Sequence, residues 1–267
     1  MGVIGDLSLA AVDILWEDLK LGGIPFPLEV RAHGDTAEER GRIRAAVYAQ
    51  LERRGLASSG RPTAELEDTL TLLAAPKISI DLVALCEMTD ETPLRAVVAA
   101  RGKRAVLAVQ RELAISLSEV RETAIVGSIV DLLPPNRSGP GQSVTLPASM
   151  LGARSVVSVG RHRRADSAGP LLHTATRESD LAGELRFVDS VTERPTFAAG
   201  SIGIVLRDER GKVQRLPGIG FFDTDLGRYA TSVMRGADGE DWTTLSPADN
   251  ARLAHRLAET LVTALQS

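Results

Sequence analysis

Cysteine and aromatic residues are scarce in this chain of 267 residues. The only cysteine is Cys86, which excludes an intrachain disulfide framework and leaves cysteine-based zinc motifs without ligands. We expect it to be a small buried side chain inside a strand. Aromatic residues make up 3% of the sequence, whereas hydrophobic residues make up 43%. The core must therefore be built from Leu, Val, Ile and Ala, and the chain has enough of them for a sizeable core.

Net positive charge and long apolar runs are also absent. The net charge is −4 and the pI is about 5.7, which gives no overall attraction to nucleic acid or anionic lipid. No apolar run reaches the length of a transmembrane helix. The first residues carry Asp6, Asp13, Glu17 and Asp18 where a signal peptide would be basic and then apolar. These absences predict a soluble cytoplasmic protein without direct membrane insertion.

The sequence contains no signature of a known catalytic or cofactor site. A nucleophile elbow G-x-S-x-G is absent, and glycine clusters such as 218–220 lack both a third glycine and a Walker lysine. The histidines are scattered without metal-ligand spacing. They are His33, His162, His173 and His255. We therefore predict no catalytic residue, no cofactor-binding residue and no metal ligand.

Residues 77–120 have the period-two pattern of strands with one buried face. Apolar residues alternate with polar ones at 78–82 and again at 113–117. The two apolar runs between them are joined by residues 101–104, where Gly102 can supply the positive φ of a hairpin turn. This pattern predicts an antiparallel meander.

Helix signals flank the meander on both sides. The clearest is Thr36 followed by Glu39, a capping box that starts a helix with Val47 and Leu51 on its buried face. Helices are predicted at about 8–21, 36–54, 62–75, 125–133, 147–159, 177–191 and 246–265. Strands outside the meander are predicted at 26–30, 197–207, 213–216, 228–234 and 242–245.

The order of these elements repeats along the chain. Each half runs helix, helix, several strands, helix, although the residues themselves do not repeat. We predict an α+β fold in a single domain, 1–267, whose halves share one core sheet and are related by a pseudo-twofold. The halves are about 1–133 and 147–267, joined by a Pro/Gly linker at 134–146.

Aromatic residues near the C-terminus suggest a partner-binding site. Phe221 and Phe222 lie in the run GIGFFDTDLG, which is typical of a Gly/Asp-rich loop. Adjacent side chains of an extended backbone point in opposite directions, so one ring can stay accessible and anchor a partner. The candidate partner-binding residues are Phe221, Phe222, Tyr229 and Trp242. The alternative is that both phenylalanines cover the edge of the core.

Six segments in a fixed order carry a family resemblance over nearly the whole chain. They are VDILWEDLKLGGIPFPLEV, ERGRIRAAVYAQLERRGL, GRPTAELEDTLTLLAAP, LRAVVAARGKRAVLAVQ, DTDLGRYATSV and GEDWTTLSPADNARLAHRLAETL. In this order they resemble the EspG family of type VII secretion-associated proteins, the cytoplasmic chaperones of the ESX systems in actinobacteria. None of the segments is a catalytic signature.

The resemblance implies a central antiparallel sheet flanked by two helical bundles in a quasi-twofold arrangement. It also implies binding to the helical tip of PPE proteins in PE/PPE pairs, through the sheet and the C-terminal bundle, which keeps the pairs soluble for export. The loop at about Glu87 to Thr92 is short, whereas family members that embrace their substrate can use a longer one. The expected partner is therefore a PPE-like protein or a related WXG-like secreted helical hairpin.

From these observations we expect a non-enzymatic secretion chaperone, without a cofactor, that acts as a monomer or homodimer and binds no nucleic acid. Two other classes remain open. One is an enzyme of unrecognised class, with a site assembled from scattered residues. The other is a nucleic-acid-binding module that uses the basic loop Arg161–Arg164.

Overall fold

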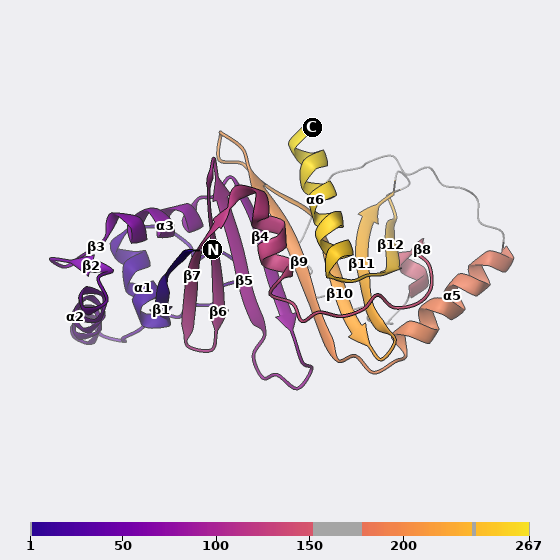
Figure 1. Cartoon of the computed structure of the whole chain (residues 1–267), viewed down its shortest axis with the longest axis horizontal. Helices are drawn as coiled ribbons and strands as arrows, with labels where there is room; N and C mark the ends of the chain where they lie inside the picture. Colours follow the sequence, from indigo (N-terminus) through magenta and orange to yellow (C-terminus); the bar gives the residue numbers. More distant parts are fainter. Residues whose placement is uncertain (1, 152–177, 237–238, 267) are drawn as a thin grey trace. The chain divides into compact units, whose positions relative to one another are not determined.

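The computed structural model describes residues 2–151, 178–236 and 239–266, and Figure 1 shows its helices and strands. The chain forms two compact units, each assembled from several stretches of the sequence. The first unit comprises Met1–Asp81, Leu94–Ile129 and Arg207–Lys212. The second comprises Leu82–Pro93, Val130–Leu206 and Val213–Ser267.

The sheet of the first unit is an antiparallel meander. Its strands follow the order β1-β7-β6-β5, and β4 lies next to β5. Between β5 and β6 the chain turns through Gly102, whose φ of 59° is the left-handed conformation expected for this hairpin. The meander predicted for residues 77–120 is confirmed. The strands are β1 (Gly2–Ser8), β4 (Ile78–Leu85), β5 (Leu94–Arg101), β6 (Arg104–Arg111) and β7 (Ala114–Arg121).

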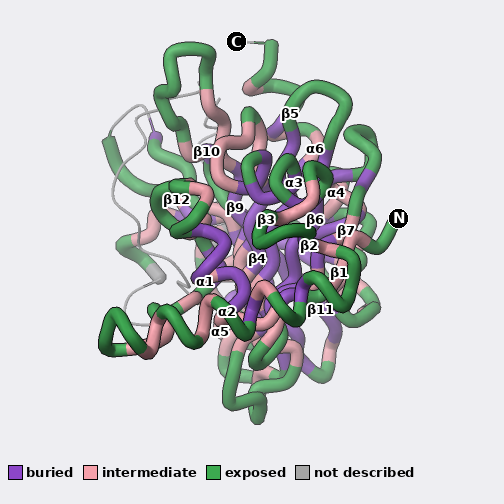
Figure 2. Tube along the Cα trace, turned by 90° about the vertical axis from the view of Figure 1, so that its left-hand side faces the viewer, coloured by how far each residue is buried: buried purple, intermediate pink, exposed green. Residues whose placement is uncertain are grey.

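The long helices of the first unit are α1 (Leu9–Asp18), α2 (Ala37–Arg53) and α3 (Ala64–Ala74). Alternate residues of β5, β6 and β7 share one apolar core with α1 and α3, as period-two strands require. In Figure 2 the buried stretches follow the strands, and the outer turns and both ends of the chain are exposed. The core residues include Ile14, Leu15, Leu70, Leu73, Val97, Ala99, Val106, Ala108, Ile115 and Leu117.

The predicted cap of α2 is present, and α1 is capped in the same way. The Ala11 amide donates to Ser8 Oγ at 3.2 Å, and the Glu39 amide donates to Thr36 Oγ1 at 3.2 Å. The Glu39 carboxylate in turn accepts from the Asp35 amide at 3.1 Å, one residue before the cap. Because a helix leaves its first amides without intrahelical acceptors, these contacts fix where both helices begin.

Ion pairs connect α1 to α2. Arg40 Nη1 lies 2.9 Å from Asp13 Oδ2, and Arg40 Nε donates to Glu17 at 2.7 Å. The Asp13 carboxylate also accepts from the His33 amide at 2.8 Å. Burial raises the pKa of Asp13, but the hydrogen bonds from Arg40 and His33 and their positive charge outweigh it, so its pKa is lowered overall.

The second unit contains five further strands in the order β9-β10-β11-β12-β8, with β4 next to β9. The pairs β10/β11, β11/β12 and β12/β8 are antiparallel. These strands are β8 (Val144–Pro147), β9 (Ala198–Arg207), β10 (Val213–Thr224), β11 (Gly227–Arg235) and β12 (Asp241–Pro247). Its long helices are α5 (Glu178–Thr192) and α6 (Asn250–Gln266).

The register of the strands shows which side chains lie on each face of this sheet. Phe222 pairs with Tyr229, and both join an apolar cluster with Val188 and Val191 of α5. Phe221 pairs with Ala230, and therefore faces the opposite side, on which Arg228 contacts the first residue of α6. We call these sides the α5 face and the α6 face.

Short elements complete the described chain. They are β2 (Ala57–Ser58), β3 (Arg61–Pro62), η1 (Glu122–Ala124), α4 (Ile125–Val130) and η2 (Ala148–Leu151). The predicted α+β class, with an antiparallel sheet flanked by helices, is confirmed. The single domain and its halves 1–133 and 147–267 stay a prediction.

Local predictions fail at four places. Cys86 follows the end of β4 in a bend and is partly exposed, not buried inside a strand. Residues 26–30 form no strand, because Pro25 and Pro27 lack the amide donors that a ladder needs. Residues 2–8 form β1, where no strand was predicted. The predicted linker 134–146 ends in β8, and Pro147 closes that strand where a helix was expected to begin. The rest of the predicted helix 147–159, beyond η2, lies outside the described residues.

The first prediction concerns Gly200 in β9. A Cβ there would lie 2.6 Å from the Val83 carbonyl oxygen and 2.8 Å from a Phe221 ring carbon. We expect Gly200→Ala to lower the free energy of unfolding by about 1–3 kcal/mol, because neither the backbone nor the packed ring can give way. Urea denaturation measures this change.

The matched control is Gly41→Ala in the middle of α2, where nothing lies within 4 Å of the new Cβ. This variant should raise the free energy of unfolding by about 0.5–1 kcal/mol, since alanine favours the helix. Equal effects of the two variants would contradict the close packing at Gly200.

The second prediction is a pH dependence of Asp13. Since the pKa of Asp13 is lower in the folded state than its ordinary value of 3.8, its ionised form adds stability above that value. This contribution disappears as the pH falls through the folded pKa. Asp13→Asn should therefore be less stable than wild type at pH 7, and the difference in free energy of unfolding should shrink below about pH 4.

The control for this titration is Asp68→Asn. Asp68 lies 2.8 Å from Arg104, but both side chains are about half exposed. An exposed ion pair contributes only about 0–1 kcal/mol, so this variant should change stability little at any pH. A constant difference between Asp13→Asn and wild type from pH 7 to pH 2.5 would refute the role of the ionised Asp13.

Candidate partner-binding site

The structure separates the four predicted partner-binding residues into three buried rings and one at the surface. Phe221, Phe222 and Tyr229 are 1%, 4% and 0% exposed. Phe222 stacks on Tyr229 at a centroid distance of 5.7 Å, and Tyr229 Oη donates to the Pro140 carbonyl at 3.1 Å. Trp242 is partly exposed.

The expectation of an accessible phenylalanine in a loop is wrong. Residues 213–224 form β10, so the two adjacent rings point to opposite faces, and each face is covered. The alternative, that both rings belong to the core, is the one observed. Contact between any of the four residues and a partner stays a prediction.

Trp242 lies on the α6 face, near one end of β11 and β12. It pairs with Met234 of β11 and with Pro147 of β8, and Met234 is 37% exposed. The next pairs on the same face are polar, with Thr244 Oγ1 2.8 Å from Thr145 Oγ1. This end of the α6 face thus exposes large apolar side chains next to hydroxyl groups.

The C-terminal half of α6 exposes two more apolar side chains. Val262 is 51% exposed and Leu265 is 59% exposed. Leu265 continues the row of buried Leu253, Leu257 and Leu261 by one further turn of the helix, where that row becomes exposed. Figure 1 shows α6 starting beside β11 and running toward the end of the sheet at which β11 ends. We define Met234, Trp242, Val262 and Leu265 as the β11–α6 surface.

The β11–α6 surface has the chemistry of a protein-binding patch. Exposed Met, Trp, Val and Leu side chains bind by removing apolar area from water. Its border on the same face is polar and is formed by Thr244 and Thr145. Apolar centres with polar rims are typical of protein–protein interfaces. Sequence reasoning selected Trp242 by residue type but missed Met234, which only the strand register brings beside it.

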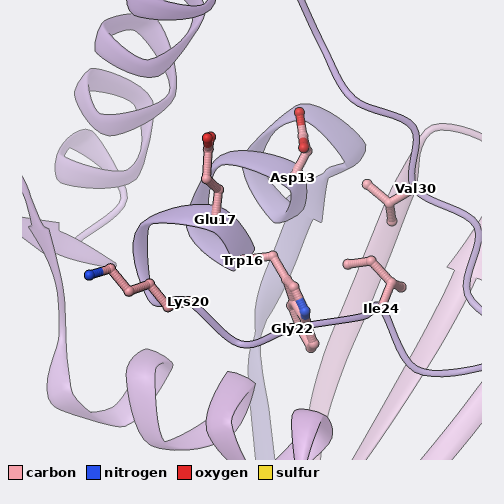
Figure 3. A pocket seen from close by; sticks show the side chains of 7 residues that line it. All are labelled: Asp13, Trp16, Glu17, Lys20, Gly22, Ile24 and Val30. Carbon is pink, nitrogen blue, oxygen red and sulfur yellow. The ribbon is translucent and has the colours of Figure 1, made fainter.

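A small pocket of about 250 Å³ lies at the end of α1 in the first unit. Figure 3 shows the carboxylates of Asp13 and Glu17 on one side and the indole of Trp16 on the other. Both carboxylates are engaged by Arg40. They are therefore poorly placed to act as free acid or base groups.

The two histidines that the structure describes, His33 and His255, lie in different segments of the chain. His33 contacts Asp13 at 3.4 Å, and His255 contacts Glu259 at 3.2 Å on the surface of α6. His162, His173 and the loop Arg161–Arg164 lie outside the described residues. Within residues 2–151, 178–236 and 239–266, no group of three His, Cys, Asp or Glu could hold a metal ion. No helix in these ranges is long and apolar enough to cross a membrane.

Comparison with known proteins identifies the family. No curated protein sequence matches the chain. Among solved structures, the chain is similar to the Mycobacterium tuberculosis type VII secretion system chaperone EspG5, solved in complex with the PE25–PPE41 dimer. The sequence identity is 15%, the TM-score is 0.67, and the match covers 96% of this chain and 95% of EspG5. Residues 8–259 match the sequence profile of the EspG family, and the chain therefore belongs to this family.

Proposed function

We propose that this chain is a cytoplasmic chaperone of a type VII (ESX) secretion system. It binds the helical tip of a PPE-like or WXG-like protein and keeps that protein soluble until export. Membership of the EspG family supports this function, as does the fold shared with a chaperone that was solved with a PE–PPE dimer. The function is non-enzymatic and uses no cofactor.

The β11–α6 surface is the part of the second unit that we assign to the partner. A helical tip presents apolar side chains at helical spacing, and these need an apolar surface on the receiving protein. Each square ångström of apolar area removed from water contributes about 25 cal/mol, before the cost of association. The α6 face of the sheet and helix α6 can each contact such a tip.

The pairing of Met234 with Trp242 is the observation that carries this assignment. The two side chains lie on the α6 face, where they remain at least partly exposed. Tryptophan is enriched among residues that dominate binding energy, and methionine adapts its shape to irregular partners. The pair therefore offers both an anchor and an adaptable contact.

Capture from the native cell followed by measured affinity tests the function. A tagged protein is isolated with its partners, which are identified by mass spectrometry. We expect secreted helical-hairpin proteins of the PPE or WXG type, and the purified partner should then bind in isothermal titration calorimetry. Absence of such proteins, or a purified partner that does not bind, would contradict the function.

The third prediction concerns the β11–α6 surface. Met234→Asp and Leu265→Asp each place a carboxylate at an apolar contact, where burial without a counter-charge is costly. Each should weaken binding of the purified partner by about 2 kcal/mol or more, roughly 30-fold. The free energy of unfolding should change little, because both side chains are exposed in the free protein.

Leu113→Asp is the matched control for this prediction. Leu113 is 77% exposed and belongs to the first unit, outside the β11–α6 surface. Its variant should bind the partner with wild-type affinity. A loss of affinity in the control equal to that of Met234→Asp would show that the partner does not select the β11–α6 surface.

A further inference from the structure

Arg228 is a fully buried charged residue at the start of β11. Its side chain is 0% exposed, and its Nε and Nη2 atoms donate to Asp223 at 2.7 and 2.8 Å. The two residues face one another in the register of β10 and β11. This bidentate pair is the geometry in which a guanidinium binds a carboxylate with the greatest directionality.

The remaining donors of Arg228 reach two other elements. Nη1 donates to Asn250 Oδ1, at the first residue of α6. Nη2 also donates to the Pro134 carbonyl at 3.1 Å, and Asn250 Nδ2 donates to the Leu133 carbonyl at 3.3 Å. The guanidinium carbon lies 5.0 Å from the centre of the Phe221 ring. One side chain therefore connects β10, the start of α6 and the segment before Arg137.

The backbone of Arg228 connects the same elements. Its amide donates to the Arg137 carbonyl at 2.8 Å, and its carbonyl accepts from the amides of Gly139 at 3.1 Å and Ala248 at 3.0 Å. Gly227 makes this approach possible, since a Cβ there would lie 2.7 Å from the Arg137 oxygen. Residues 133–139 and the entry to α6 thus converge on a single position of β11.

Stability alone does not account for a buried charge pair. Taking both ions out of water has a cost that their attraction often fails to recover, and apolar pairs of similar volume are frequently as stable. The best-supported advantage of such a pair is that it selects one arrangement, because any other arrangement leaves a buried charge unpaired. Here the selected arrangement is the position of α6 on the sheet.

We propose that Arg228 is a positioning residue for partner recognition. Through Asp223 and Asn250 it fixes the start of α6 against β10 and β11, and so sets the direction of the helix that carries Val262 and Leu265. This role rests on the proposed function, because it assigns the partner to the β11–α6 surface. Arg228 itself is fully buried and acts on binding only through α6.

The test replaces the charge pair by an apolar pair of similar size, Arg228→Met with Asp223→Leu. Three quantities are measured: the urea midpoint, amide hydrogen exchange, and affinity for the purified PPE-type or WXG-type partner identified by capture. We expect the midpoint to stay close to wild type. Exchange at residues 133–139 and in the first two turns of α6 should rise about tenfold, and affinity should fall about tenfold.

The control neutralises an exposed pair of the same unit, Arg194→Met with Asp225→Leu. Arg194 and Asp225 lie 2.5 Å apart but are 42% and 47% exposed. This variant should leave exchange in α6 and affinity unchanged. If the buried double variant does not fold, Arg228→Lys serves instead, since it keeps the charge and loses the fork that joins Asp223 to Asn250.

The outcomes separate this inference from the proposed function. Wild-type exchange in α6 of the folded double variant would overturn the positioning role. Faster exchange with unchanged affinity would also overturn it, because the position of α6 would then not matter for binding. A wild-type protein that binds neither a PPE-type nor a WXG-type partner would instead refute the proposed function, while the exchange data would still decide whether Arg228 fixes α6.

Discussion

The antiparallel register between β10 and β11 is the constraint on which the second unit depends. It places Phe222 opposite Tyr229 on the α5 face and Asp223 opposite Arg228 on the α6 face. Because successive side chains alternate between faces, a shift of one residue would move the charge pair into the apolar cluster of α5. That alternative would leave ions without partners among aliphatic side chains, so the sequence strongly favours the observed register.

Glycines allow other segments to approach this pair of strands. A Cβ at Gly139 would lie 2.3 Å from the Tyr229 ring, so the segment before β8 can lie on the ring only because that position is glycine. The ring stacks on Phe222 and meets Phe187 edge-on at 6.4 Å. A chain with few aromatic residues thus concentrates three of them in one cluster, where each ring buries a large area.

Local signals predicted elements well but not their contacts. The cap at Thr36 and the period-two pattern of the meander depend on neighbours in sequence, and both were confirmed. Gly218 made β10 look like a loop, whereas its Cβ would lie 2.9 Å from the Ile202 oxygen, which is a close approach between strands. The other wrong prediction concerns the partner-binding surface, which depends on pairing between strands. Nothing along the chain shows that Met234 lies opposite Trp242, so Trp242 alone of the four residues of the β11–α6 surface was predicted.

The two faces of the sheet are covered differently, and this difference explains how the folded protein can keep an apolar surface exposed to solvent. The α5 face carries the aromatic cluster, and α6 covers the other face from its start at Arg228 through Leu253, Leu257 and Leu261. Beyond that point the strands carry Thr244 and Thr145 between the apolar pair and the helix start, so exposed apolar area is interrupted by hydroxyls. An apolar patch that is interrupted in this way limits self-association. It still binds a partner favourably when the partner's own apolar tip is buried against it. Most of the favourable free energy of binding then comes from burying the partner's own apolar tip, which suits a protein that must later release that partner.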